Sequence, residues 1–333
     1  MAVETVGRGA GESALAGRLS QLPKQPAAFA VVLALLLLIV NIIVQPDFVG
    51  SGQIAGTLGT LAPFAIAGMA STPAILSGGG GIDLSIAPLM GFTNIMLVTK
   101  LLGTTLGGPL LAIPILLIMG GLVGAINGVM VTRFRIPPVI ATLSTYFVLT
   151  GANLELAPNP VPAPPNWTNN LAASVGPVPG AIITVGALIL LWLWLRRTPF
   201  VEMLLSVGDH DATAFSSGVS VDAVRIGAYA LGGLIAGAGG IALTGLVQTA
   251  DPQVWTTYVL IALAAVALGG TNMFGGRGGL VLSAVGAASI FLLENLLTNL
   301  HASAYFINVA YGGVLFIAVV LGARMFPADR GGT

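Results

Sequence analysis

Cysteine and charge are scarce in this chain. It has no cysteine, which excludes disulfides, thiol catalysis and cysteine-ligated metal sites. Its two histidines, His210 and His301, lie too far apart in sequence to suggest a metal site, so we expect none. Only 7% of the residues are charged, whereas a soluble domain carries about 25%. The twelve basic and twelve acidic residues cancel, so bulk charge indicates no nucleic-acid partner.

Apolar residues dominate what is present. They make up 56% of the chain, and the mean hydropathy is +0.97, so the surface must face a lipid bilayer. A polar segment, 1–26, precedes the run "AAFAVVLALLLLIVNIIVQ", whose 19 residues can cross a hydrocarbon core of about 30 Å as a helix. A cleaved signal peptide would have a shorter apolar region and a small-residue cleavage site. We interpret this run as a retained first helix.

Apolar runs recur along the whole chain. Because backbone polar groups must be paired within lipid, each run is expected to be a helix. We predict an all-α, polytopic membrane protein with about ten transmembrane helices, five in each half. An odd number of spans in each half requires related halves to be inverted repeats, so a 5+5 inverted repeat is expected. The runs lie at 27–45, 53–77, 84–102, 109–132, 138–157, 178–195, 223–248, 258–273, 279–299 and 304–323.

The basic residues test this span count. Ten spans put both termini on one side, and lysine and arginine are enriched in cytoplasmic segments. With the N-terminus in the cytoplasm, eleven of the twelve basic residues lie inside and only Lys100 lies outside. The eleven are Arg8, Arg18, Lys24, Arg133, Arg135, Arg196, Arg197, Arg225, Arg277, Arg324 and Arg330. We therefore expect a cytoplasmic segment 1–26, one transmembrane domain over 27–323 with a cytoplasmic loop at 196–222, and a cytoplasmic tail at 324–333.

Four consecutive glycines stand in "LSGGGGIDLSIAPLMG", residues 76–91. A nucleotide-binding P-loop needs Gly-Lys-Ser/Thr, and neither lysine of the chain follows that pattern, so this chain hydrolyses no ATP through such a loop. The glycines instead predict a helix interruption at membrane depth. Asp83 then lies at the start of the next helix, with Ser85 close by. Two interpretations are open: Asp83 caps the helix and fixes the break, or it contacts a solute.

Ionisable residues inside spans are functional by default, and Glu294 is the clearest, followed by Glu155. For Glu294, a functional and a packing role are equally open. Asparagine, serine and threonine residues accompany it within or at the ends of spans, and each alone more often joins helices than binds a ligand. Together they suit a neutral polyhydroxylated solute. The candidate pathway residues are Asp83, Ser85, Asn94, Asn127, Thr142, Ser144, Asn153, Glu294 and Asn295.

The cytoplasmic segment "GDHDATAFSSGVSV", residues 208–221, predicts a short helix with a capping-type start at Asp211 and a glycine stop at Gly218. Adjacent residues in one loop cannot supply the geometry of a Ser-His-Asp triad, so catalysis there is rejected. Between two spans, such a helix would form a rigid knob that another subunit could push. A further glycine cluster, 268–279, predicts a tight turn anchored by Arg277.

Four stretches resemble one family. "GGIDLS" at 80–85, "IPPVIATLST" at 136–145, the 208–221 segment and "GGTNMFGGRG" at 269–278 resemble the permease subunits of ribose-type ABC sugar importers, related to branched-chain amino-acid permeases. The sequence departs from the family at Gly79, where threonine is usual.

The resemblance implies two permease copies in the cytoplasmic membrane of a bacterium, an ATP-binding subunit that holds ATP and Mg, and an extracytoplasmic solute-binding protein. It assigns ATPase coupling to Gly208, Asp209, His210, Asp211, Ala212, Phe215 and Gly218. It assigns structural roles to Gly80, Gly81, Gly269, Gly270, Gly275 and Gly276.

We therefore predict a non-enzymatic permease subunit that moves a monosaccharide or related polyol and needs no cofactor of its own. Two alternatives remain at this point. A proton-coupled secondary transporter would use Glu294 as the proton carrier. An intramembrane enzyme would need paired Ser, His or Asp groups at a shared depth, and the sequence offers none.

Overall fold

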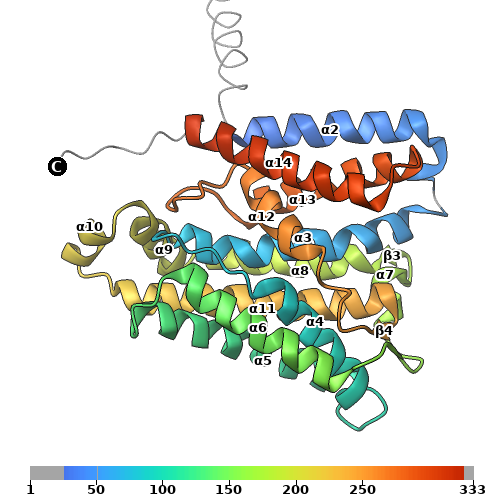
Figure 1. Ribbon diagram of the computed structural model, residues 1–333, viewed down its shortest axis with the longest axis horizontal. Coiled ribbons are helices and arrows are strands. Elements are labelled where there is room, and N and C mark those ends of the chain that lie inside the picture. Colours follow the sequence, from blue (N-terminus) through green and yellow to red (C-terminus); the bar gives the residue numbers. More distant parts are fainter. Residues whose placement is uncertain (1–25, 51, 326–333) are drawn as a thin grey trace, which may run out of the picture.

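The computed structural model describes residues 26–50 and 52–325, and these form a helical bundle with only four two-residue strands (Figure 1). The predicted all-α class is confirmed. The predicted segments 1–26 and 324–333 lie almost wholly outside the described residues. The long helices are α2 (Pro26–Val44), α3 (Ile54–Leu76), α5 (Pro109–Thr132), α6 (Pro138–Leu156), α8 (Gly180–Leu195), α11 (Val221–Val247), α13 (Leu280–Asn299) and α14 (Ala304–Met325).

The shorter elements lie between these helices. They are the 3-10 turn η2 (Pro46–Val49), α4 (Ile86–Met96), the π-helical turn η3 (Leu97–Leu101), α7 (Asn169–Ala172), α9 (Pro199–Asp209), α10 (Asp211–Ser216) and α12 (Tyr258–Leu268). Strand β1 (Val161–Pro162) pairs antiparallel with β4 (Thr249–Ala250), and β2 (Ser174–Val175) pairs antiparallel with β3 (Val178–Pro179).

Within residues 26–50 and 52–325, five helices are long and apolar enough to cross a membrane: α3, α5, α6, α11 and α13. A sixth span is possible if α8 and α9, which are bent by 82° relative to each other, count as one. Shorter apolar helices lie at 28–44, 86–101, 258–268 and 304–320. The chain is thus a multi-pass membrane protein. Each of the ten predicted runs holds a helix, while the number that cross the bilayer stays a prediction.

The helices α4 and α12 are short, and each follows a non-helical interruption of the chain. At 1.5 Å per residue, the 11 residues of α12 reach about 16 Å, roughly half of a hydrocarbon core of about 30 Å. The interruption before α4 covers 77–85 and the one before α12 covers 248–257, and each follows a long buried helix, α3 or α11. The α12 helix is therefore too short to cross such a core alone, whereas α4 continues directly into η3 as far as Leu101.

Two long helices, α3 and α11, form the centre of the bundle. The α11 helix packs on α5, α3 and α4, and α3 packs on α13, α12 and α8. In Figure 1, α2 and α14 lie at one edge of the bundle, and α5 and α6 lie at the opposite edge. Small residues allow the closest of these contacts. A Cβ on Gly124 of α5 would collide with the Tyr229 backbone of α11, so only glycine permits this approach.

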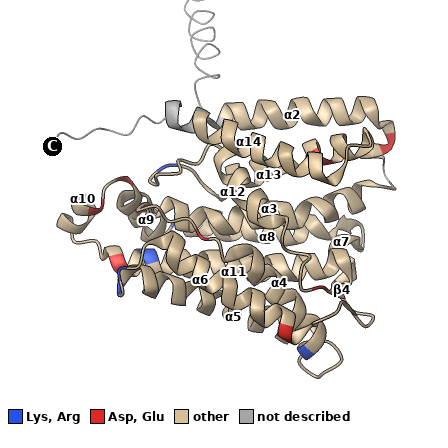
Figure 2. Cartoon of the chain, in the orientation of Figure 1, with Lys and Arg blue, Asp and Glu red and all other residues tan. Residues whose placement is uncertain are grey.

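The two ends of the bundle differ. The helices α9 and α10 lie at one end, and α7 and the strands lie at the other (Figure 1). Figure 2 shows charged residues mainly toward these ends, with long uncharged helix surfaces between them. The sequence predicted one short helix in the loop 196–222, but the loop holds two. The amphipathic α9 was missed; its Val201, Leu204 and Val207 are buried, because a helix bent back under the bundle buries one face.

Candidate functional site

The chain is interrupted after α3, as the glycines predicted. Gly78, Gly79 and Gly80 have φ angles of +71°, +61° and +73°, a backbone region that favours glycine, and α4 begins only at Ile86. Asp83 is 4% exposed, and its Oδ1 accepts the N–H of Ser85 at 2.9 Å and the hydroxyl of Ser85 at 2.6 Å. The carboxylate thus fixes the chain just before α4. The N-cap of α4 is Ser85, and no side chain caps an amide inside the helix, so Asp83 fixes the break without capping α4. Contact of Asp83 with a solute stays a prediction.

A polar network extends from the interruption to α5 and α6. Asn127 Nδ2 donates to Ser85 Oγ at 2.8 Å, and Thr145 Oγ1 donates to Asn127 Oδ1 at 2.5 Å. Thr142 donates to the carbonyl of Ile82 at 3.2 Å and to that of Pro138 at 2.9 Å. Three segments far apart in sequence therefore meet in one hydrogen-bonded cluster, which includes the predicted residues Asp83, Ser85, Asn127 and Thr142.

Two more candidates, Asn94 and Asn153, join helices near this cluster. Asn94 Nδ2 donates to Thr244 Oγ1 of α11 at 2.9 Å, and Asn153 Nδ2 donates to the carbonyl of Pro88 in α4 at 3.1 Å. Both residues are fully buried, and neither Oδ1 atom has a hydrogen-bond partner among the described residues. Each side chain therefore joins two helices and keeps one free acceptor.

The remaining candidates lie elsewhere. Asn295 on α13 donates to Asn41 of α2 at 2.8 Å, which holds α2 against the bundle. Its neighbour Glu294 lies beside Tyr311 of α14, and the two side chains are close enough to interact. Ser144 is exposed and donates only to the Ile140 carbonyl of its own helix. The structure does not bring these residues into the Asp83 cluster.

The end of α3 also meets two other loops, at what we call the glycine junction: Gly78, Gly208, Gly275 and Gly276. The amide of Gly276 donates to the Leu76 carbonyl at 3.1 Å. A Cβ on Gly275 would lie 2.6 Å from the Gly78 Cα, and one on Gly208 would collide with the Leu76 carbonyl. Backbone therefore touches backbone here, and two of the stretches that resemble the family, 208–221 and 269–278, meet at the end of α3.

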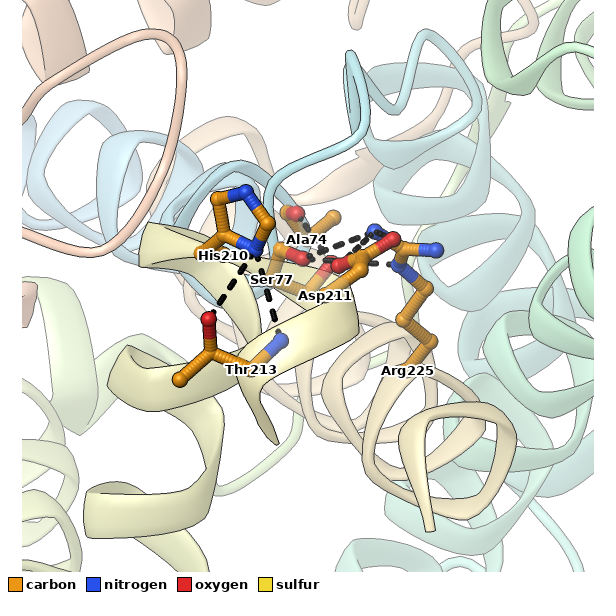
Figure 3. Close-up of polar contacts among 6 residues, drawn as sticks. All are labelled: Ala74, Ser77, His210, Asp211, Thr213 and Arg225. Carbon is orange, nitrogen blue, oxygen red and sulfur yellow. Dashed lines mark hydrogen bonds and ion pairs between the residues drawn. The ribbon is translucent and has the colours of Figure 1, made fainter. Parts of the chain in front are cut away.

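The helix α10 has a different start from the predicted one. Asp211 is its first residue, and the N-cap is His210, whose Nδ1 accepts the N–H of Thr213 at 3.3 Å (Figure 3). The aspartate is instead turned toward Arg225 of α11, in the ion pair drawn in Figure 3. The predicted stop at Gly218 is confirmed by its φ of +85° and by its N–H, which donates to the Phe215 carbonyl at 2.9 Å.

The turn that joins α12 to α13 is held by Asn272. Asn272 Nδ2 donates to the Gly275 carbonyl at 2.9 Å, and its Oδ1 accepts the N–H of Phe274 at 3.1 Å. The sequence predicted an anchor at Arg277, but no hydrogen bond joins the Arg277 side chain to a described residue. An asparagine closes a tight turn more readily because its short amide reaches the local backbone.

Comparison with known proteins places these features in one family. The family model described as the branched-chain amino acid transport system permease component matches residues 47–323. The chain belongs to this family. It is 34% identical to the ribose import permease protein RbsC of Bacillus subtilis over 86% of this chain and 89% of that protein. It is 28% identical to the fructose import permease protein FrcC of Rhizobium meliloti over 90% of this chain and 86% of that protein. No solved structure matches the chain.

Two residues at the site of this permease were missed from the sequence, Arg225 and Tyr229. Arg225 was counted only as a cytoplasmic charge, yet a cation in the early turns of a helix opposes the helix dipole unless it has an anionic partner. The place of Arg225 near the start of its helix could therefore have indicated an anionic partner. Tyr229 follows four residues later, on the same helix face, and its buried hydroxyl has no hydrogen-bond partner among the described residues.

Proposed function

We propose that this permease is the membrane subunit of an ABC importer in the cytoplasmic membrane of a bacterium. It moves a monosaccharide or related polyol, while a separate subunit binds ATP and Mg and hydrolyses the ATP. The 208–221 segment receives the force of that subunit. A second permease copy and an extracytoplasmic solute-binding protein complete the importer.

The glycine junction is the observation that carries this proposal. Gly208 at the end of α9 contacts the end of α3, so a push on α9 and α10 reaches a central helix through rigid backbone contact. On α10, Ala212 and Phe215 are exposed, and Phe215 is 73% exposed, so both side chains are free to meet a partner. An importer powered by another subunit needs such a projecting contact.

The order of helix contacts supports the inverted repeat. Matching span for span pairs α3 with α11, α4 with α12, α5 with α13 and α6 with α14. The α11 helix packs on α4 and α5, and its counterpart α3 packs on α12 and α13. In the same way, α4 packs on α6 and α12 packs on α14. Together with the two interruptions, this exchange supports ten segments, five in each half. The distribution of basic residues supports the cytoplasmic side for both termini.

A neutral polar solute fits the buried groups. Among the candidate pathway residues that carry amides and hydroxyls, Asn94 and Asn153 keep free carbonyl oxygens. Such groups pass a hydroxylated solute along without a charged partner. The relatives named for ribose and fructose import agree with this class of solute.

The alternative is a secondary transporter with Glu294 as the proton carrier, and the feature that favours it is a partly buried carboxyl group within an apolar helix. Glu294 lies on α13 beside α14, away from the Asp83 cluster and the glycine junction. A secondary transporter needs no contact with an ATP-binding subunit, so it does not explain the exposed helix α10. We therefore prefer the importer.

Uptake by proteoliposomes tests the proposal. The permease would be reconstituted with the ATP-binding subunit and the solute-binding protein of the same importer, and uptake of radiolabelled ribose, fructose and allose measured. We expect uptake of a monosaccharide that requires ATP and both partners and that stops when the Walker lysine of the ATP-binding subunit is replaced. Uptake by the permease alone in a proton gradient would instead establish the secondary transporter.

A further inference from the structure

One guanidinium joins three segments at the cytoplasmic end of the bundle. Arg225 of α11 donates from one terminal nitrogen to both carboxylate oxygens of Asp211, each at 2.8 Å. Its Nε and the same terminal nitrogen also lie 3.4 Å from the Ser77 carbonyl at the end of α3 (Figure 3). Arg225 is therefore the side chain that connects α10 to the start of the interruption at 77–85.

The position of this guanidinium depends on a glycine. A Cβ on Gly79 would lie 2.6 Å from the terminal nitrogen of Arg225, and Gly79 has a φ of +61°. Any side chain at position 79 would displace the guanidinium from Asp211 or from Ser77. The guanidinium of Arg225 thus packs directly against the backbone of Gly79 in the interruption.

Arg225 also lines a cavity. The cavity has a volume of about 220 Å³ and lies between the interruption, the loop from α5 to α6, and α11. The buried Tyr229 hydroxyl belongs to its lining, together with Ser77, Gly79 and Arg135. A displacement of Arg225 therefore changes the wall of a cavity next to the Asp83 cluster.

We propose that Arg225, through its ion pair with Asp211, is the positioning residue that transmits movement of α10 to the interruption and to this cavity. This inference rests on the proposed function and names the link between the driven helix and the solute pathway. The ion pair attracts α10 toward α11, so it transmits movement in both directions, whereas the close contacts of Gly208 with α3 transmit only a push.

A second ion pair on the same face provides a matched control. Arg133 at the end of α5 lies 3.9 Å from Asp222 in the first turn of α11, and both side chains are well exposed, at 71% and 48%. This pair involves no residue of α10. Its removal takes away the same charges and leaves the proposed link intact.

The experiment compares sugar transported per ATP hydrolysed by the complete importer in proteoliposomes. The main variant is D211N, since the Asp211 side chain is 49% exposed and its change leaves the packing intact. We expect the ratio to fall about fivefold, the low end of coupling between sites, because water screens a half-exposed pair. R225Q should give a similar fall, and D211E, which keeps the carboxylate that Arg225 binds, should retain most of the ratio. The control D222N should leave the ratio at the wild-type value.

Two results would overturn the inference. A wild-type ratio in both D211N and R225Q would show that the ion pair transmits nothing. An equal fall in D222N would assign the effect to general surface charge, and an equal fall in D211E would show that the ion pair is not its cause. If the wild-type importer itself shows no ATP-driven uptake, the proposed function fails, and the two failures are thereby distinguished.

Discussion

Gly208→Ala is the sharpest perturbation of the glycine junction. A Cβ at this position would collide with the Leu76 carbonyl and with the Gly276 amide. Both are backbone groups, and they are joined to each other by a hydrogen bond of 3.1 Å. Neither can rotate away as a side chain would, so α9 must shift relative to α3.

The expected cost follows from this overpacking. Adding a methyl group to a tightly packed contact destabilises a protein by about 1–3 kcal/mol. For a chain of this size, we expect the melting midpoint in detergent to fall by about 2–6 °C. Because the displaced helix carries α10, sugar uptake per ATP hydrolysed should fall as well. The assays are thermal stability by fluorescence-detected size-exclusion chromatography and uptake by the reconstituted importer.

Gly186→Ala is the matched control for Gly208→Ala. Gly186 lies within α8, and a Cβ there would meet nothing within 4 Å. Alanine is the better helix former, so this change should leave the midpoint unchanged or raise it slightly. An unaltered midpoint and normal uptake in Gly208→Ala would refute a tight junction at the end of α3.

Three further changes test the polar contacts. Asp83→Ala should lower the free energy of unfolding by about 2–3 kcal/mol, because it leaves the Ser85 N–H without its acceptor, while Asp83→Asn should cost less; thermal stability measures both. Asn41→Leu and Asn295→Leu both remove the contact between these residues, and Asn41→Leu also removes the bond to the Leu292 carbonyl, so the double variant should cost little more than Asn41→Leu alone. Glu294→Gln should keep ATP-driven uptake within about twofold. The change removes only the charge and the titratable proton, and a group outside the pathway does not contribute to binding of the solute. A loss of uptake, with the variant permease present in the membrane at its normal amount, would show that Glu294 takes part in transport.

Much of the architecture could be predicted from the sequence because lipid imposes simple rules. Apolar runs must be helices, and all ten predicted runs hold one. The glycines at 78–80 correctly predicted the interruption after α3. The partial length of α12 was missed, because "LGG" at 268–270 continues the apolar composition of the run while Gly270, at φ +75°, already ends the helix.

The contacts of the site were harder to foresee. Asp83 and Ser85 are neighbours in sequence, so their bond could be expected from local geometry. The meeting of Gly78, Gly208 and Gly275 depends on how three loops pack, which no local pattern encodes. For the same reason, Asn295 looked like Asn127 in sequence, yet one holds α2 and the other joins the Asp83 cluster.

The absence of cysteine makes the central claim directly testable, because a single introduced thiol has no background. Phe215→Cys would place that thiol on the exposed face of α10. In oriented membrane vesicles of the assembled importer, we expect a membrane-impermeant maleimide to label it only from the cytoplasmic side, and a short bifunctional reagent to link it to the ATP-binding subunit. Labelling from the outside, or free labelling without any cross-link to that subunit, would contradict the account.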